Sequence, residues 1–336
     1  MDLLRRDRAL EAAVSFRAVG GRREWTDLDR KEIEKINKTN KHNGQYKLFL
    51  SDLLAFGMAR AYMPDAARRI VVVVAGASPG QHWAHLIPIL LASNMGDRIT
   101  FELYDSEELC DEMQTLVREN DSIEFCQQLF TTETAKEIKQ KYKDSYIVFL
   151  SDIRSSIHER AKHDAGDEKV IQENMRLQSD AVAIMLPVYS CLKFHAPHAT
   201  PGHKEAYPSF KYLHGVLCLQ AYTYALSAEL RLHVTLDDIT VEKLENQQLY
   251  DPVEIEQCAF HNNTIRRPCT HTDQNFEDNV WRATMSELGV DPGSVHQRRA
   301  RVKECLHTHN EHNKHRENVG ALHSLLSRMR AKPPRS

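Results

Sequence analysis

The feature that most constrains the fold is a continuous run of β-branched residues that leads directly into a glycine-containing turn. Residues 70–75 read Ile-Val-Val-Val-Val-Ala, and Gly76-Ala77-Ser78-Pro79-Gly80 follows them. An uninterrupted apolar run of this length is typical of a strand that is buried on both faces. Because such a strand needs helices on either side of its sheet, the run predicts an α/β fold.

The rest of the chain alternates expected strands with expected helices. The ranges expected as strands are 70–75, 99–104, 122–126, 146–150, 190–194, 216–221 and 230–234. The ranges expected as helices are 46–62, 82–93, 107–119, 132–143 and 170–185. This alternation predicts a Rossmann-like, doubly wound, mostly parallel sheet with helices on both faces, together with N- and C-terminal extensions.

The composition is that of a soluble globular protein and argues against several other classes. Hydrophobic residues make up 41% of the chain, charged residues make up 27%, and the formal net charge is -3. Nucleic-acid binding would therefore need a local basic surface. The seven cysteines include no Cys-x-x-Cys pair, which argues for a reducing compartment and against a zinc ribbon. Without an apolar signal core or membrane-length apolar run, we expect a soluble intracellular protein with no membrane partner and no metal.

The glycine turn indicates a site for a nucleoside. Glycines let the backbone approach a ligand closely, and a following helix N-terminus offers N–H groups. The turn lacks the middle glycine of a dinucleotide motif and the Gly-Lys-Ser/Thr of a phosphate-binding loop. Asp105 ends the next expected strand, where a carboxylate can bond a ribose diol. S-adenosylmethionine therefore fits better than NAD, and a plain strand–helix connector is the structural alternative.

Four charged residues, Lys47, Asp152, Lys193 and Glu229, stand in short patterned segments. Asp152 closes an expected strand, at the sheet edge where α/β proteins bind ligands. Glu229 lies between apolar runs, so a buried carboxylate there must have a partner. A lysine made less basic by burial or a second cation could take the proton of a ribose 2′-hydroxyl. Together the four residues fit methyl transfer to ribose, whereas singly Lys47 could be a surface residue and Asp152 a helix cap.

The segments around these residues resemble a known family. They are similar to the poxvirus cap-specific mRNA (nucleoside-2′-O-)-methyltransferases, which also serve as the stimulatory small subunit of the viral poly(A) polymerase. More broadly, they resemble the RrmJ-type 2′-O-methyltransferases. The matching stretches cover roughly residues 40–270 and are 44–48, 76–80 with His82, 149–155, 186–193 and 224–232.

The resemblance implies a methyltransferase fold that binds S-adenosylmethionine, and it gives each site residue a role. It implies that Lys47, Asp152, Lys193 and Glu229 form the catalytic tetrad, with Lys193 at its centre. The residues it places against the cofactor are Gln45, Val74, Gly76, Ala77, Ser78, Pro79, Gly80, His82, Asp105 and Asp152. The residues it places against the capped RNA are Trp25, Arg154, His195, Ala196, Pro197, His198, Ser227, Ala228 and Glu229.

One departure from the family bears on recognition of the cap. The family stacks 7-methylguanine between two aromatic rings. One of these positions holds His198 instead of phenylalanine, and Trp25 is the candidate for the other ring. The acid that bonds the methylated base is expected at Asp251, Glu254 or Glu256.

The expected organisation follows from these assignments and from the charge of the C-terminal part. We expect an N-terminal extension over 1–40 that could contact the cap, the methyltransferase domain over 41–270, a helical part over 271–305, and a basic, His-rich tail over 306–336. The basic residues that could follow an RNA backbone, or else belong to a solvated tail, include Arg298, Arg299, Arg301 and Lys303.

The function expected from the sequence is methyl transfer from S-adenosylmethionine to a ribose 2′-hydroxyl near the 5′ cap of mRNA. The expected partners are capped mRNA and the catalytic subunit of a poly(A) polymerase. The resemblance implies a viral protein of the cytoplasm, in a viral factory or virion, rather than of the nucleus. The alternatives are a non-catalytic RNA-binding processivity subunit of that polymerase, a role that could coexist with catalysis, and methylation of uncapped RNA.

Overall fold

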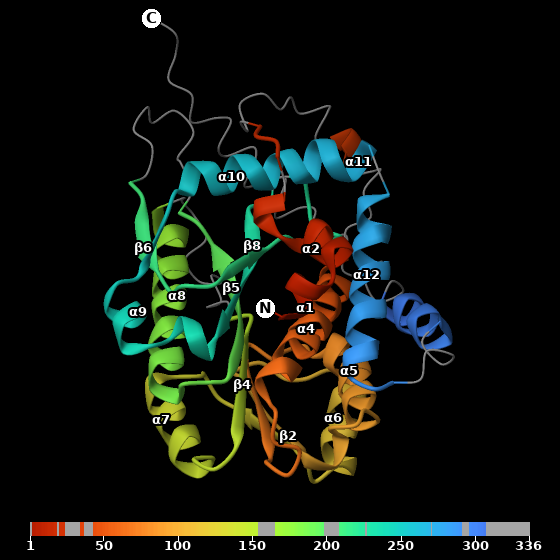
Figure 1. The fold of residues 1–336 in the computed structure, drawn as a ribbon. Helices are drawn as coiled ribbons and strands as arrows, with labels where there is room; N and C mark the ends of the chain where they lie inside the picture. Colours follow the sequence, from red (N-terminus) through yellow and green to blue (C-terminus); the bar gives the residue numbers. More distant parts are fainter. Residues whose placement is uncertain are drawn as a thin grey trace, which may run out of the picture.

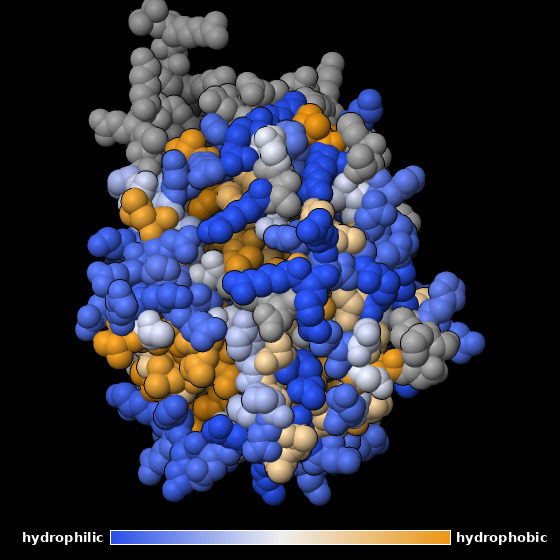
Figure 2. Space-filling view, in the orientation of Figure 1, coloured by the Kyte–Doolittle hydropathy of each residue, from blue (hydrophilic) through white to orange (hydrophobic). Residues whose placement is uncertain are grey.

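The computed structural model describes residues 2–18, 20–23, 34–36, 43–153, 165–197, 208–225, 227–269, 271–290 and 296–306. None of the helices in these ranges is both long enough and apolar enough to cross a membrane. The face shown in Figure 2 is largely hydrophilic, with an apolar group on the side where the helices of residues 132–141 and 241–245 lie.

A seven-stranded sheet forms the centre of the molecule (Figure 1). Its strands are β1 (Ile70–Ala75), β2 (Ile99–Asp105), β3 (Ile123–Gln127), β4 (Tyr146–Ser151), β5 (Tyr189–His195), β7 (Val216–Cys218) and β8 (Glu229–Thr235). Their order is β3-β2-β1-β4-β5-β8-β7. The first five strands pair in parallel, and β8 pairs antiparallel with both β5 and β7. The predicted mostly parallel, Rossmann-like sheet is thus confirmed.

Helices cover both faces of this sheet. The helices that precede β5 in the sequence are α1 (Asp2–Arg6), α2 (Arg8–Val14), α4 (Gly44–Ala59), α5 (Gln81–Leu91), α6 (Asp111–Glu119), α7 (Thr132–Lys141) and α8 (Ala165–Met185). The helices that follow β8 are α9 (Val241–Glu245), α10 (Pro252–His261), α11 (Arg267–Cys269) and α12 (Thr272–Glu287). The π-helix η6 (Asn262–Arg266) joins α10 to α11, and residues 296–306 form a further helix.

Two short strands were not predicted. They are β6 (Phe210–Tyr212) and β9 (Gln248–Tyr250), which pair antiparallel as a separate two-stranded sheet. The strand predicted over 216–221 also ends earlier, at Cys218. Three residues are too few to display the alternation of apolar and polar side chains by which a strand is recognised.

The alternation of side chains along β1 divides the core into two layers. Ile70, Val72 and Val74 pack in one layer with α4, α5, α6 and α12, while Val71 and Val73 pack in the other with α7 and α8. All six β1 residues are buried, as the uninterrupted apolar run predicts.

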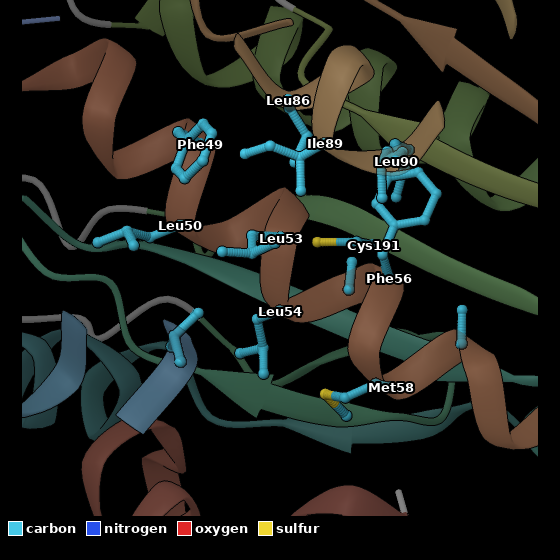
Figure 3. Packing of buried hydrophobic residues seen from close by; sticks show 14 of the residues in the cluster. Phe49, Leu50, Leu53, Leu54, Phe56, Met58, Leu86, Ile89, Leu90 and Cys191 are labelled. Atoms are coloured by element: carbon cyan, nitrogen blue, oxygen red, sulfur yellow. The ribbon is translucent and has the colours of Figure 1, made fainter. Parts of the chain in front are cut away.

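Helix α4 is the central helix of the first layer. Its apolar side chains lie against those of α5 and against Cys191 of β5, as Figure 3 shows for Phe49, Leu53 and Leu86. Truncating one such buried leucine to alanine typically costs about 2–5 kcal/mol. This packing fixes the axis of α4, whose first turn carries two of the predicted site residues, Gln45 and Lys47.

Candidate active site

The four charged residues singled out in the sequence meet at one edge of the sheet. Lys47 lies in the first turn of α4, Asp152 directly follows β4, Lys193 lies in β5, and Glu229 opens β8. Lys47 Nζ lies 2.6 Å from Glu229 Oε1. Lys193 Nζ lies 3.1 Å from Asp152 Oδ1 and 3.2 Å from Glu229 Oε2. Buried Glu229 therefore has two ammonium partners, and Lys193 lies between two carboxylates.

Sheet register explains why these side chains share one face. In the antiparallel β5–β8 pair, Lys193 lies opposite Arg231 and His195 lies opposite Glu229. Residues two apart on a strand point to the same face, so all four of these side chains project from one side of the sheet. Asp152 joins them because β4 ends beside β5.

Arg231 is a member of this cluster that the sequence analysis missed. Its Nη2 lies 2.7 Å from Asp152 Oδ1, and its Nη1 donates to the carbonyl oxygen of Ser151 over 3.0 Å. Burial disfavours the guanidinium charge, but Asp152 and Glu229 outweigh this effect and raise the pKa of Arg231. The available signal was a single arginine within an apolar strand, two residues after Glu229.

The cluster is largely shielded from solvent and carries more cations than anions. Side-chain exposure is 11% for both lysines, 6% for Glu229, 3% for Arg231 and 27% for Asp152. With all groups ionised, the three cations Lys47, Lys193 and Arg231 exceed the two carboxylates by one charge. Such a site can attract phosphate groups, and Asp152 is its most open member.

The glycine turn lies directly against Asp152. Gly76 has φ 86° and Gly80 has φ 76°, in the left-handed region that favours glycine. A Cβ atom on Gly76 would lie 2.8 Å from the backbone carbon of Asp152, which any side chain would have to displace. The turn approaches the end of β4 so closely that the fold requires glycine at position 76, whether or not a ligand binds there.

Asp105 is fixed to the same turn. Its Oδ2 accepts a hydrogen bond from the backbone N–H of Ser78 over 2.9 Å, and its Oδ1 accepts one from Glu107 over 3.0 Å. The carboxylate is half-buried, and each of its oxygens can accept a second hydrogen bond. Asp105 is thus held in a position from which it can bond a ligand at the end of β2.

Gln45 and His82 contact each other across the gap between α4 and α5. Gln45 Oε1 accepts a hydrogen bond from the backbone N–H of His82 over 3.1 Å and lies 3.0 Å from His82 Nδ1. On its other side, His82 Nε2 lies 3.2 Å from Asp52 Oδ2, and both of these side chains are buried. Because His82 is enclosed in this way, it orients Gln45 rather than presenting its own ring at the surface.

The other predicted cofactor residues are placed less directly. The side chains of Val74 and Ala77 are buried in the core, so only their main-chain atoms could face a ligand. Ser78 donates its hydroxyl hydrogen to the carbonyl oxygen of Glu108 over 2.7 Å, and Pro79 is exposed.

The predicted RNA contacts are only partly described by the structure. Trp25, Arg154 and His198 lie outside the described residues. His195 lies beside the tetrad, opposite Glu229, and its Nδ1 is 3.0 Å from the carbonyl oxygen of Ala196. Three of the residues predicted to contact RNA have buried side chains, so they could meet RNA only through their main-chain atoms. They are Ala196, Pro197 and Ala228.

The candidate acids for the methylated base lie elsewhere. Asp251 caps α10, and Glu254 pairs with Arg22 over 2.6 Å. Both line a cavity of about 410 Å³ between the N-terminal helices, β7 and β9, and no member of the tetrad lines it. Glu256 is half-buried on the same helix.

The segment that leads to Glu229 is held by the π-helix η6. Asn263 Nδ2 donates to the carbonyl oxygen of Ser227 over 2.8 Å, and Thr223 Oγ1 donates to Asn263 Oδ1 over 3.1 Å. Arg267 Nη1 donates to the carbonyl oxygen of Thr223 over 2.8 Å. Short π-helical segments often occur at functional sites. This support was not visible in the sequence, because the π-helix has no recognised pattern.

The expectations for the basic C-terminal residues are wrong for two of them. Arg299 and Lys303 neither face solvent freely nor form an open phosphate-binding surface, because both pair with the buried carboxylate of Glu277 over 2.6 Å. A cation that neutralises a buried carboxylate is held there by the cost of leaving that charge unpaired.

The sequence was compared with models of known protein families. The sequence model of the family described as poly A polymerase regulatory subunit matches residues 20–283. The matched range includes the tetrad, the glycine turn and Arg231. No curated protein matches the chain significantly.

Proposed function

The chain belongs to the poly(A) polymerase regulatory subunit family, and from this premise we propose that it is also an RNA 2′-O-methyltransferase. The family implies a poly(A) polymerase catalytic subunit as partner. The proposed reaction is methyl transfer from S-adenosylmethionine to a ribose 2′-hydroxyl near the 5′ cap of mRNA. The observation that carries the proposal is the contact among Lys47, Asp152, Lys193 and Glu229 beside the glycine turn.

The turn and its neighbours fit the proposed cofactor. Asp105, anchored by Ser78 and half-buried, can accept hydrogen bonds from ribose hydroxyls. The left-handed glycines Gly76 and Gly80 leave the backbone uncovered by side chains where a ligand would approach. Gln45, in the first turn of α4, accepts a hydrogen bond from the backbone N–H of His82 at the start of α5, the helix that follows the turn. When bound, S-adenosylmethionine would supply a methyl group carried on a cationic sulfur. Transfer of that methyl group to the ribose oxygen turns the sulfonium into a neutral thioether.

The tetrad would orient the hydroxyl and handle its proton. Lys193 Nζ, held between Asp152 and Glu229, is the group that would hydrogen-bond the 2′-hydroxyl and, as a neutral amine, accept its proton. Glu229 would stabilise the ammonium that results, while Lys47 fixes Glu229 from the other side. Most of the rate would come from holding the oxygen in line with the methyl group.

The decisive experiment compares Lys193→Ala with the unaltered protein in a methyl-transfer assay. We expect the variant to lose about 10²–10⁴-fold in rate, the usual contribution of a general acid–base group, with S-adenosylmethionine binding by calorimetry retained. Lys136→Ala is the matched control, because Lys136 is exposed on α7 and pairs only with nearby Glu133 among its described contacts. Full activity in the Lys193→Ala variant would overturn the mechanism.

Substrate choice is tested with the same assay on capped and uncapped transcripts of one sequence. The proposal expects faster methylation of the capped RNA. Equal rates would instead support a methyltransferase of uncapped RNA.

A further inference from the structure

A buried carboxylate outside the candidate active site joins three parts of the chain. Glu277 of α12 has 0% exposure. Its Oε2 accepts hydrogen bonds from Tyr222 over 2.5 Å and from Lys303 over 2.6 Å, and its Oε1 accepts one from Arg299 over 2.6 Å. Burial raises the pKa of Glu277, but the hydrogen bonds from Lys303, Tyr222 and other neighbours outweigh burial and hold it below its ordinary value. The carboxylate is therefore ionised and depends on these donors.

Both cations come from the helix of residues 296–306, which we call the clasp helix. In Figure 1 it is drawn in blue beside α12. Arg299 and Lys303 lie on the same side as the buried residues Val302 and Leu306, at the spacing of one helical face. Arg301 is exposed on the other side. The clasp helix is thus attached to the molecule by an apolar stripe and by the two ion pairs to Glu277.

The same contacts reach the first turn of α4. Lys303 Nζ lies 5.5 Å from the ring centre of Tyr222 and 5.7 Å from that of Tyr46, within the range of cation–π attraction. Tyr46 is adjacent in sequence to both Gln45 and Lys47. A displacement of Tyr46 would therefore move both predicted site residues.

The clasp helix also holds the cap of α4. Asn43 Oδ1 accepts the backbone N–H of Tyr46 over 3.0 Å, which makes Asn43 the N-cap residue of α4. Its Nδ2 donates to the carbonyl oxygen of Leu306 over 3.3 Å, and its backbone N–H donates to the carbonyl oxygen of Tyr222 over 3.1 Å. Asn43 is completely buried. The N-cap of α4 is therefore bonded on one side to the clasp helix and on the other to Tyr222, which itself bonds Glu277.

We propose that the clasp helix, through Lys303 and Glu277, positions the first turn of α4 and thereby places Lys47 and Gln45 for methyl transfer. Glu277 and Lys303 are positioning residues, since they act on the candidate active site through Tyr46, Tyr222 and Asn43. The effect on catalysis rests on the proposed function, whereas the ordering of the α4 first turn does not.

The test replaces Lys303 with methionine in the full-length chain. Lys303→Met keeps an unbranched side chain but removes the charge, Lys303→Arg keeps the charge, and Arg301→Met removes a charge from the exposed side of the same helix. Tyr222→Phe is a second route, because it removes one hydrogen bond to Glu277 and keeps the ring. A thermal unfolding scan confirms that each variant is folded.

The first measurement is backbone hydrogen exchange at Tyr46 and Lys47, which needs no methyltransferase activity. We expect exchange there to rise at least about tenfold in Lys303→Met and Tyr222→Phe, with the middle of α4 unchanged. Lys303→Arg and Arg301→Met should match the unaltered protein. Unchanged exchange at Tyr46 and Lys47 in Lys303→Met, or an equal rise in Arg301→Met, would overturn the proposal.

The second measurement is methyl transfer. We expect kcat to fall at least about tenfold in Lys303→Met, with a much smaller change in KM for RNA and recovery in Lys303→Arg. A variant that is loosened at α4 but keeps full kcat would overturn the link to catalysis. If the unaltered protein methylates nothing, the proposed function fails while hydrogen exchange still decides the role of the clasp helix.

Discussion

Arg231 ties the end of β4 to the β5–β8 pair at the level of single side chains. It reaches both the carboxylate of Asp152 and the carbonyl oxygen of Ser151, and it is almost completely buried. Lys193 meets the same carboxylate oxygen. Asp152 is therefore shared between Arg231, whose side chain is 3% exposed, and Lys193, whose side chain is 11% exposed. Under the proposed function, Arg231 would hold Asp152 in place while Lys193 meets the substrate.

Replacing Arg231 with methionine should destabilise the fold and reduce activity. Breaking a buried ion pair costs about 3–5 kcal/mol, and the cost here should fall at or below the lower end, because Asp152 is partly exposed and keeps Lys193. Urea unfolding measures the loss, and the control is Lys136→Met on the exposed side of α7. A free energy of unfolding equal to that of the unaltered protein would show that Arg231 does not hold Asp152.

Asn263 provides a sharper test of how the Glu229 segment is held. Asn263→Asp keeps the shape and an acceptor for Thr223, but it replaces the donor to Ser227 with an oxygen that repels the carbonyl. We expect a loss of about 1–3 kcal/mol in the free energy of unfolding, the usual cost of an unsatisfied buried group. Denaturant titration checks this, with Asn275→Asp on the exposed surface of α12 as the control. A loss no larger than that of the control would contradict the role of Asn263.

At the scale of elements, the β5–β8 pair joins the candidate site to the core. The face that carries Lys193, His195, Glu229 and Arg231 is polar at the carboxyl edge and becomes enclosed further along, where His233 lies opposite Cys191. The ring of His233 lies 2.7 Å from the hydroxyl oxygen of Tyr189 through Nδ1. Burial, with the nearby charge of Arg231, lowers the pKa of His233 to about 3.

This histidine predicts a pH dependence of stability. The unfolded chain takes up a proton at His233 as the pH falls below about 6.5, whereas the folded protein takes it up only near pH 3. The unfolded state therefore binds more protons between these values, and the free energy of unfolding falls as the pH falls through this window. The slope from one group is at most about 1.4 kcal/mol per pH unit.

The measurement is urea unfolding at intervals from pH 7 to pH 5, on the unaltered protein and on His233→Gln. We expect the unaltered protein to lose stability more steeply, and the difference between the two curves isolates His233 from the other histidines. Parallel curves would show that His233 is not held neutral by the fold.

How far the sequence predicts these elements depends on their length and on the range of their contacts. The β1 run and the strands ending at Asp105 and Asp152 were predictable because each is long enough to show a pattern. The strands β6 and β9 were not, because three residues show none. Glu277 could not be predicted as buried, since an acidic residue is ordinarily exposed and its partners, Arg299 and Lys303, lie more than twenty positions further along the chain.

The candidate site was predictable in its members but not in its support. Glu229 stood out because it lies between apolar runs and Asp152 because it closes a strand, and the family resemblance grouped both with Lys47 and Lys193. Only the strand register shows that Arg231 belongs to the same cluster. The three-dimensional supports, Asn263 behind Ser227 and the clasp helix behind Tyr46, depend on hydrogen bonds between distant segments. No local pattern in the sequence records such bonds.

At the scale of the whole molecule, one chain would combine two activities, support of a poly(A) polymerase and the proposed methyl transfer. The tetrad occupies the edge formed by the carboxyl ends of β4 and β5 and by the start of β8. The family match covers residues 20–283, and the family is described as poly A polymerase regulatory subunit. Support of a polymerase forms or breaks no bond to the ribose, so it does not require a lysine that takes a proton from ribose.

Lys193→Ala should therefore separate the two activities. We expect it to lengthen the poly(A) tails made by the polymerase catalytic subunit as well as the unaltered protein does, while its methyl transfer is lost. The measurement is tail length on a denaturing gel, with the catalytic subunit alone as the baseline and Lys136→Ala as the control. Because Lys193 is only 11% exposed and lies within the cluster, its truncation leaves the outer surface nearly unchanged. If Lys193→Ala failed to stimulate the polymerase while remaining folded, the two activities would share the tetrad.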